Sequence, residues 1–84
     1  MGLSLFRVAA LGYIGESTPE VQRAVADALL DSNRVTVINA LFAARRLKIE
    51  SVVERVRPYL NSPDEEIQIR ADHYFQVVVD GERE

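Results

Sequence analysis

The sequence contains no cysteine, a single histidine and only four glycines in 84 residues. Without cysteine it forms neither disulfides nor thiolate metal sites, so nothing indicates its redox compartment. No apolar run approaches the roughly 20 residues that a membrane-spanning helix needs. No glycine-rich phosphate-binding loop is present either. These absences exclude several classes of protein and leave a small globular domain.

The lone histidine, His73, lacks the partners that a metal or catalytic site requires. Glu66 and Asp72 lie on the same predicted helix, but their spacing from His73 does not build a ligand cage. We therefore interpret His73 as a surface or half-buried helix residue. We predict no catalytic residues, no metal site and no cofactor, and do not expect an enzyme.

The N-terminal residues 2–15 are apolar, but Arg7 interrupts them and no basic segment precedes them. This pattern favours a buried first helix over a signal peptide. Gly2 does not predict myristoylation, because Phe6 stands where serine or threonine is needed. We therefore expect a cytoplasmic protein without membrane association.

The chain repeats with a period of 31 residues, as the numbering of its alanines, valines and leucines shows. The recurring sets are Ala9, Ala40 and Ala71; Val21 and Val52; Val25 and Val56; and Leu29 and Leu60. A period of this size on helical patterning is typical of stacked helix pairs. Each such pair needs a neighbour to bury its apolar face.

Apolar spacing and capping residues predict five helices. They cover residues 4–13, 19 to a turn at 31–33, 34–47, 50–60, and 63 to the tail. The second helix is expected to start with Thr18 as cap and Pro19 in the first position. The fifth is expected to start with a capping box from Ser62 to Glu65. Pro58 should bend or shorten the fourth helix, because it lacks a backbone donor.

The third predicted helix is apolar almost all round, so it should pack on more than one face. Short connections make successive helices antiparallel neighbours, with the first, third and fifth in one layer and the second and fourth in the other. The predicted fold is all-α, a five-helix antiparallel two-layer right-handed stack. Residues 1–80 are expected to form one domain and residues 81–84 a solvated tail.

Two segments resemble HEAT-like repeats of the short variety also found in phycobilisome lyase subunits. Residues 9–15 (AALGYIG) are similar to the family's helix end, and residues 64–71 (DEEIQIRA) to the entry of its next repeat. The resemblance spans residues 4–79 as about two and a half repeats. It implies a scaffold whose faces bind proteins or, less often, nucleic acid. The middle repeat departs from the pattern at Asn39, Ala43 and Ala44, so bilin chemistry is not expected.

The net charge of −3 is unevenly distributed. Residues 34–57 hold six basic and two acidic side chains, whereas residues 58–84 hold two basic and seven acidic ones. The candidate partner-binding residues are Arg45, Arg46, Lys48, Arg55 and Arg57. We interpret them as solvated helix ends, as a docking site for an acidic protein, or as contacts to nucleic-acid phosphates. Glu50 and Glu54 are both candidates to pair with Arg57.

The aromatic side chains fall mostly on buried stripes, with Tyr59 and Tyr74 expected to place their hydroxyls at the surface. Neither end of the stack has a polar cap. Apolar residues beyond the core stripes are Leu3, Leu5, Val8 and Leu11 in the first helix, and Ile69, Val77 and Val79 in the last.

These patterns favour a non-catalytic protein-interaction or scaffold module. It would bind a protein partner, or self-associate, through its apolar end helices and basic middle surface. A nucleic-acid-associated module that contacts phosphates through the basic middle helices is the alternative.

Overall fold

The computed structural model describes residues 18–81, and the expected first helix therefore lies outside the described residues. The first described helix, α2 (Pro19–Ala28), begins as predicted. The hydroxyl of Thr18 accepts a hydrogen bond from the amide of Val21 at 3.2 Å, and Pro19 occupies the first position. Proline costs nothing there because its missing donor would have no partner inside the helix.

Helix α3 (Arg34–Arg46) begins after a turn in which Asn33 is the cap. The side chain of Asn33 accepts hydrogen bonds from the amides of Val35 and Thr36. At the other end, Lys48 adopts a positive φ of 52° and the amide of Ile49 bonds back to the carbonyl of Ala44. This is a Schellman ending, in which glycine usually takes the left-handed position.

The fourth predicted helix is not one regular helix. It is a succession of a 3₁₀ turn η1 (Glu50–Val52), one α-turn α4 (Val53–Val56) and a second 3₁₀ segment η2 (Arg57–Asn61). Pro58 cannot donate to the carbonyl of Glu54, so the α-helical ladder stops there and the chain continues with the tighter 3₁₀ pattern. The expected disturbance at Pro58 is present, but the irregularity also extends to the beginning of the segment.

Helix α5 (Glu65–Tyr74) starts two residues later than predicted, and the proposed Ser62–Glu65 capping box is wrong. Its cap is Asp64, whose carboxylate accepts from the amides of Glu66 and Ile67. Ser62 instead accepts a hydrogen bond from the amide of Asp64 and so shapes the turn before the helix. A carboxylate at the cap also interacts favourably with the helix dipole.

The last segment, η3 (Phe75–Val79), is a π-helical turn, closed by a hydrogen bond from the amide of Asp80 to the carbonyl of Phe75. A π-turn is wider than an α-turn, so it changes the directions of the side chains that follow. Val77, expected on the outer face, is buried, whereas Val79 is exposed as expected. Asp80 and Gly81 are exposed, and the rest of the predicted tail lies outside the described residues.

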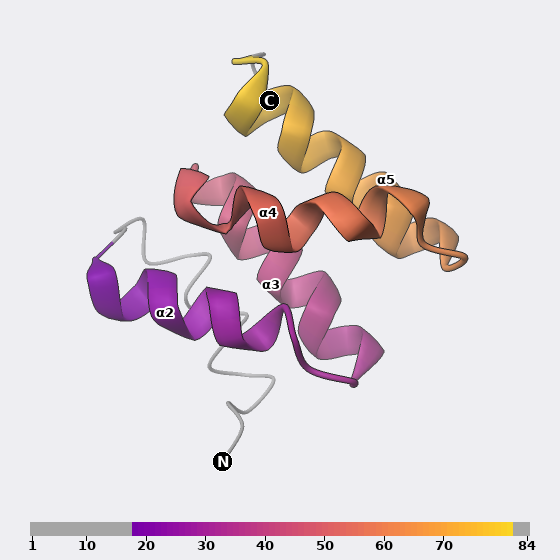
Figure 1. The fold of residues 1–84 in the computed structure, drawn as a ribbon, viewed down its shortest axis with the longest axis horizontal. Coiled ribbons are helices and arrows are strands. Elements are labelled where there is room, and N and C mark those ends of the chain that lie inside the picture. The colour runs from indigo at the N-terminus through magenta and orange to yellow at the C-terminus, as the bar shows by residue number, and fades with distance from the viewer. Residues whose placement is uncertain (1–17, 82–84) are drawn as a thin grey trace.

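All regular elements of the described residues are helices, without strands, and they form two sides (Figure 1). On one side α2 lies beside the 50–61 segment, and on the other α3 packs against α5. Three hydrogen bonds join α2 to the 50–61 segment, between Gln22 and Ser51, Ala26 and Arg55, and Leu29 and Tyr59. Their partners are always 29 or 30 residues apart, so the two segments run parallel.

Two of the pairs of positions 31 residues apart are equally buried, whereas Val21 and Leu60 are less buried than their equivalents Val52 and Leu29. Val25 and Val56 are completely buried, and so are Ala40 and Ala71. As predicted, α3 is buried on more than one face. Its buried residues are Thr36, Val37, Ala40, Leu41, Ala43 and Ala44.

The expectation that two tyrosine hydroxyls lie at the surface is wrong for Tyr74, which is completely buried, whereas Tyr59 is partly buried. The hydroxyl of Tyr59 donates to the carbonyl of Leu29, and that of Tyr74, a fully buried residue, donates to the carbonyl of Ile49. Both carbonyls lie where a helix has ended or not yet begun, so they need a donor from elsewhere in the chain. The hydroxyls supply it and join segments that are 30 and 25 residues apart in the sequence.

Candidate protein-binding surface

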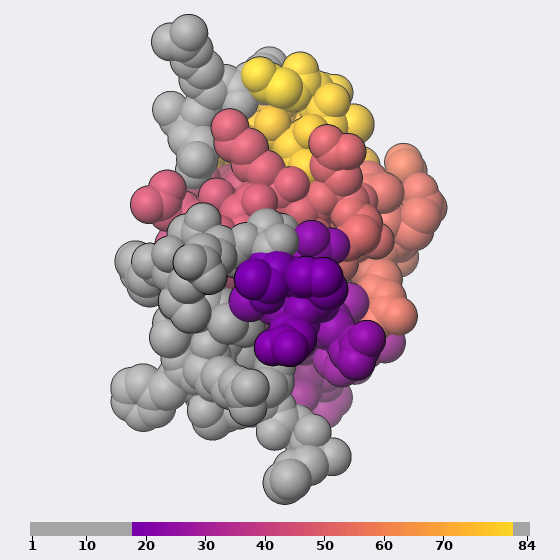
Figure 2. Space-filling model, turned by 90° about the vertical axis from the view of Figure 1, so that its left-hand side faces the viewer, coloured from indigo at the N-terminus to yellow at the C-terminus, as the bar shows by residue number. Residues whose placement is uncertain are grey.

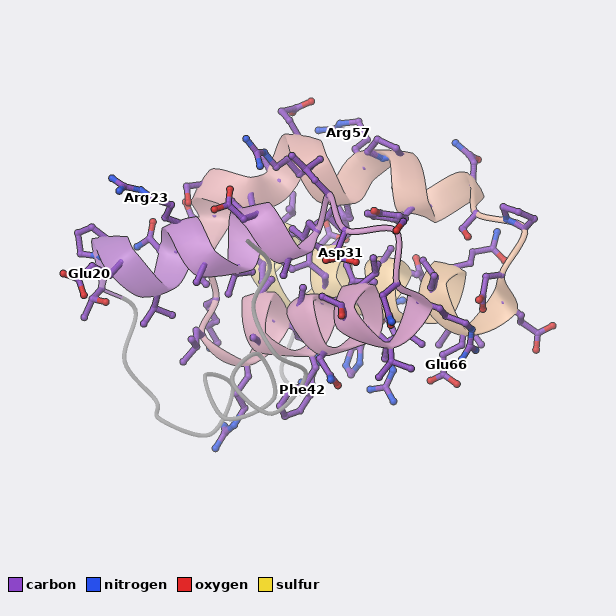
Figure 3. The ribbon with its side chains drawn as sticks, turned by 90° about the horizontal axis from the view of Figure 1, so that it is seen from below. Glu20, Arg23, Asp31, Phe42, Arg57 and Glu66 are labelled. Atoms are coloured by element: carbon purple, nitrogen blue, oxygen red, sulfur yellow. The ribbon has the colours of Figure 1, made fainter. Side chains whose placement is uncertain are left out.

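The five basic candidate residues do not form one surface. Arg45, Arg46 and Lys48 lie at the end of α3, where the guanidinium of Arg45 sits 5.5 Å from the centre of the Phe42 ring. Arg57 projects on the other side of the molecule from Phe42 (Figure 3). A single acidic partner surface would therefore not contact all five residues at once.

Arg55 and Arg57 are used inside the molecule. Arg55 donates from Nη1 to the carbonyl of Ala26 at 2.9 Å and thereby joins the two helix pairs. Arg57 forms a two-pronged ion pair with Glu54, at 3.1 and 3.3 Å, and its guanidinium lies 5.4 Å from the centre of the Phe75 ring. The hydrogen bond to Glu54 is the main reason that the pKa of Arg57 is raised.

The arrangement of α3 beside α5 brings in a residue that the sequence analysis did not select. Arg70, from the acidic C-terminal part of the chain, lies close enough to Arg45 to disfavour its charged form. Burial is the larger cause of the lowered pKa of Arg45, and Arg70 and Arg46 add like-charge repulsion. Arg70 is itself held by Glu66 at 3.1 Å. Only knowledge of the helix packing would have identified this cluster.

Among the five candidates, the exposed cations left for an external partner are Arg46 and Lys48. Both side chains are exposed, and neither forms an ion pair with any residue in the range 18–81. Two neighbouring charges of this kind attract a carboxylate or phosphate group, although an exposed pair contributes little energy by itself.

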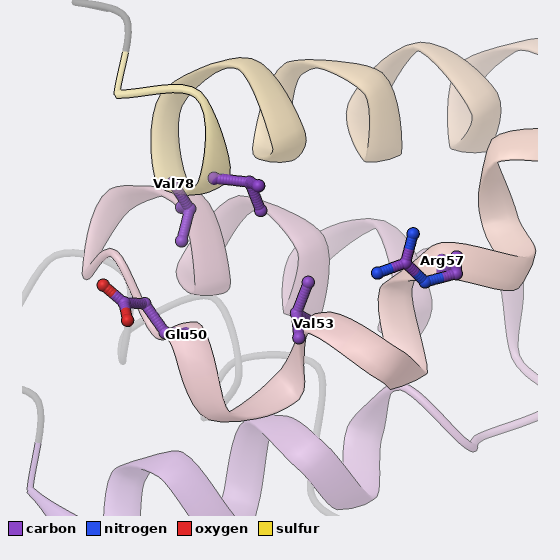
Figure 4. Close-up of a pocket in the computed structure, with 5 residues that line it drawn as sticks. Glu50, Val53, Arg57 and Val78 are labelled. Carbon is purple, nitrogen blue, oxygen red and sulfur yellow. The ribbon is translucent and has the colours of Figure 1, made fainter.

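Four large apolar side chains are exposed: Leu30 and Val35 flank the turn between α2 and α3, whereas Ile69 and Val79 lie at the end of the stack formed by the 50–61 segment, α5 and η3. Two open pockets lie there. One, of about 410 Å³, is lined by Glu50, Val53, Arg57, Val78 and Val79 (Figure 4). The other, of about 390 Å³, is lined by Leu60, Gln68, Ile69 and Asp72. We call these nine residues the C-terminal face.

Two residues of the C-terminal face are large apolar side chains with more than half of their surface exposed. The exposed fraction is 58% for Ile69 and 52% for Val79. Figure 2 shows the C-terminal turn (yellow) next to the segment around residue 50 at one end of the molecule.

Three residues of the C-terminal face occupy positions that, one period earlier, join the two helix pairs. Val53, Arg57 and Leu60 correspond to Gln22, Ala26 and Leu29 at a spacing of 31 residues. Those three earlier residues provide the hydrogen-bond partners of the 50–61 segment described above. This part of the C-terminal face therefore corresponds by sequence to the junction between the two helix pairs.

The lone histidine has no partners for a metal site among the described residues. His73 is half-buried, as predicted, and residues 18–81 contain no group of three or more His, Asp or Glu side chains that is arranged to hold a metal ion. Nor does any helix in this part of the chain have the length and apolar character to cross a membrane. The two pockets and the exposed cations are thus the features that a functional proposal has to explain.

Comparison with known proteins identifies no relative: no protein-family model, no curated protein and no solved structure matches this chain.

Proposed function

We propose that the chain is a non-catalytic protein-binding module built from stacked helix pairs of the HEAT-like type. The observation that carries this proposal is the C-terminal face, whose pockets are open and whose side chains are partly apolar. Stacked repeats that end in water usually carry polar outer faces. An apolar end is therefore expected to be covered by another protein when the module is in use.

The HEAT-like part of the proposal is supported by the constant separation of partners across the two helix pairs. The same separation is found between α3 and α5. Their N-terminal ends are joined by the ion pair of Arg34 and Asp64, which are 30 residues apart. A right-handed five-helix stack with a first helix at residues 4–13 is the arrangement we propose for the whole chain.

The basic end of α3 is proposed as a second, weaker contact for an acidic protein partner. Arg46 and Lys48 are its contact residues, whereas Arg55 and Arg57 already serve contacts within the molecule. The grouping of Arg45, Arg46 and Arg70 keeps nucleic acid as the alternative ligand. Phosphate binding is distinguished by its steep loss with rising salt, because it releases condensed counterions.

The test is a pull-down from lysate with the tagged chain, with and without nuclease. Three variants accompany it: Val79→Lys for the apolar face, Arg46→Glu/Lys48→Glu for the basic end, and Arg23→Glu as a control. Arg23 is an exposed residue on α2 without an ion pair to any described residue. Its charge reversal matches the type of substitution made at the basic end of α3 and leaves both proposed contacts intact.

Protein bands that survive nuclease, weaken with Val79→Lys and persist with Arg23→Glu would support the proposal. Bands lost only with Arg46→Glu/Lys48→Glu would place the contact at the basic end. Material that disappears with nuclease would favour the nucleic-acid alternative. If every variant captured the same proteins as the wild type, neither surface would be a binding site.

A further inference from the structure

The two pockets of the C-terminal face follow each other along one boundary, between the 50–61 segment and the helix formed by α5 and η3. The first pocket joins the start of the segment to η3, and the second joins its end to α5 (Figure 4 shows the first). Four lining residues come from the segment, at spacings of three and four that place them on one side of a helix: Glu50, Val53, Arg57 and Leu60.

The separation of the two pockets suits a helix as the occupant. Val53 lines the first pocket and Leu60 the second, seven residues later. Seven residues of α- or 3₁₀-helix span roughly 10–14 Å. Side chains at positions i and i+7 of a partner α-helix are about 10.5 Å apart along its axis. A partner helix that lies along the boundary therefore reaches both pockets with two apolar side chains.

One period earlier, a helical segment already occupies the equivalent positions. In the inner junction α2 contacts the 50–61 segment through hydrogen bonds at three positions, and the equivalents of these positions line the two pockets. The carbonyl of Leu60, however, already accepts a hydrogen bond from Gln68, whereas the equivalent carbonyl of Leu29 accepts from Tyr59. A helical occupant at the C-terminal face is therefore recognised by the pockets and by charge.

The C-terminal face is more polar than its equivalents, and its charge is negative. Four of its nine residues are polar, whereas two of the nine residues 31 positions earlier are polar. Glu50 and Asp72 are exposed acids without an ion pair to any residue in the range 18–81. The cation of this face, Arg57, is already paired with Glu54. With Glu54 included, three carboxylates lie beside one guanidinium, which leaves two negative charges in excess.

We propose that the C-terminal face binds a basic amphipathic helix of a partner protein, which lies along the boundary between the 50–61 segment and α5. Two apolar side chains of that helix enter the pockets, and its lysines or arginines meet Glu50 and Asp72. The acidic excess selects a basic partner, because unlike charges attract across an interface and like charges repel. This names the class of partner for the protein-binding role proposed above and rests on that role.

The test measures the binding of three alanine-based helical peptides to the purified chain by fluorescence anisotropy. The first peptide carries leucines at positions i and i+7 with lysines beside them. The second has glutamates in place of the lysines, and the third has alanines in place of the leucines. The first should bind with a dissociation constant below about 1 mM, and each of the others at least about tenfold more weakly.

Charge reversal locates the contact on the chain. Glu50→Lys and Asp72→Lys should each weaken the binding of the basic peptide by about three- to tenfold. Asp27→Lys is the matched control, because Asp27 is an exposed acid on α2 that lines neither pocket, and its reversal changes the net charge equally. The double variant Glu50→Lys/Asp72→Lys should bind the acidic peptide instead. Circular dichroism verifies that every variant is folded.

The proposal would be overturned if the basic peptide did not bind up to about 1 mM, or if the acidic peptide bound the wild type equally well. Equal losses with Asp27→Lys and Glu50→Lys would also overturn it, because the peptide would then respond to the total charge of the chain. None of these results would touch the protein-binding role itself. Protein bands that weaken with Val79→Lys in the pull-down would still support that role.

Discussion

The two helix pairs use the same apolar spacing on different backbones. In the first pair, α2 is a regular ten-residue helix, whereas its counterpart at 50–61 is divided into 3₁₀, α and 3₁₀ pieces. Nevertheless Val25 and Val56 are equally and completely buried. The comparison shows that equivalent side chains can be buried equally although the backbone hydrogen bonds of the two segments differ.

The largest expected difference between the pairs concerns Leu29 and Leu60, which are equivalent by sequence. Leu29 is completely buried, but Leu60 is half-buried and lines an open pocket. Leu29→Ala should lower the free energy of unfolding by about 3–5 kcal/mol, and Leu60→Ala by less than half as much. Urea denaturation of both variants tests this. Equal losses would mean that the C-terminal face is as well covered as the inner junction.

The next prediction concerns the backbone at equivalent positions Asp27 and Pro58. Asp27 is exposed in the interior of α2, so Asp27→Pro should cost about 3 kcal/mol or more through the lost ladder alone. Pro58→Ala should change stability by no more than about 1 kcal/mol, because the segment already lacks a continuous ladder. Thermal unfolding of the two variants compares them. A large effect at Pro58 would show that its ring is needed for packing.

The tyrosine hydroxyls provide an intermediate effect. Tyr74→Phe removes a donor from a buried carbonyl of Ile49 and should cost about 1–3 kcal/mol. Tyr59→Phe should cost less, because Tyr59 is only half-buried and water can reach the carbonyl of Leu29 more easily. Chemical denaturation measures both. A larger loss of stability for Tyr59→Phe than for Tyr74→Phe would mean that the carbonyl of Leu29 is less accessible to water than the carbonyl of Ile49.

The ends of the two pairs differ in the residue that takes a positive φ. It is Lys48 after α3, with φ 52°, and Gly81 after η3, with φ 76°. Lys48→Gly should therefore raise stability by about 1 kcal/mol, because it relieves the left-handed strain. Gly81→Ala, where a Cβ would meet nothing within 4 Å, should lower it by a similar amount. Calorimetry measures both changes in stability. A lower stability of Lys48→Gly would contradict the proposed backbone strain at Lys48.

The smallest effect is a dependence on pH. The hydrogen bond from Arg34 is the main cause that lowers the pKa of Asp64. A lowered pKa in the folded state means that this contribution is complete above about pH 4, the ordinary value, and is lost as the pH falls through the folded value. Asp64→Asn keeps a good helix cap but removes the charge. Its stability should approach that of the wild type as the pH falls, and a constant gap would refute the ion-pair contribution.

Local rules account for the helices that the sequence predicted correctly. Thr18 with Pro19 begins α2, and the burial of Val25 and Val56 follows from the 31-residue spacing. The errors arose where two local rules competed. Ser62 and Asp64 are both good N-cap residues, and the local sequence does not distinguish them. In the fold the cap is Asp64, whose carboxylate also accepts a hydrogen bond from Arg34, while Ser62 accepts one from the amide of Asp64.

The sequence by itself determined the helical class, the period and the buried stripes, because these depend on neighbours within a few residues. Only the tertiary structure decided which groups the arginines contact, since these groups are far away along the chain. It assigned Arg55 to the carbonyl of Ala26 and put Arg70 near Arg45. It also left Val79 exposed beside a pocket while burying Val77. A side chain's surroundings are set by segments about one period away, which composition and local spacing do not specify.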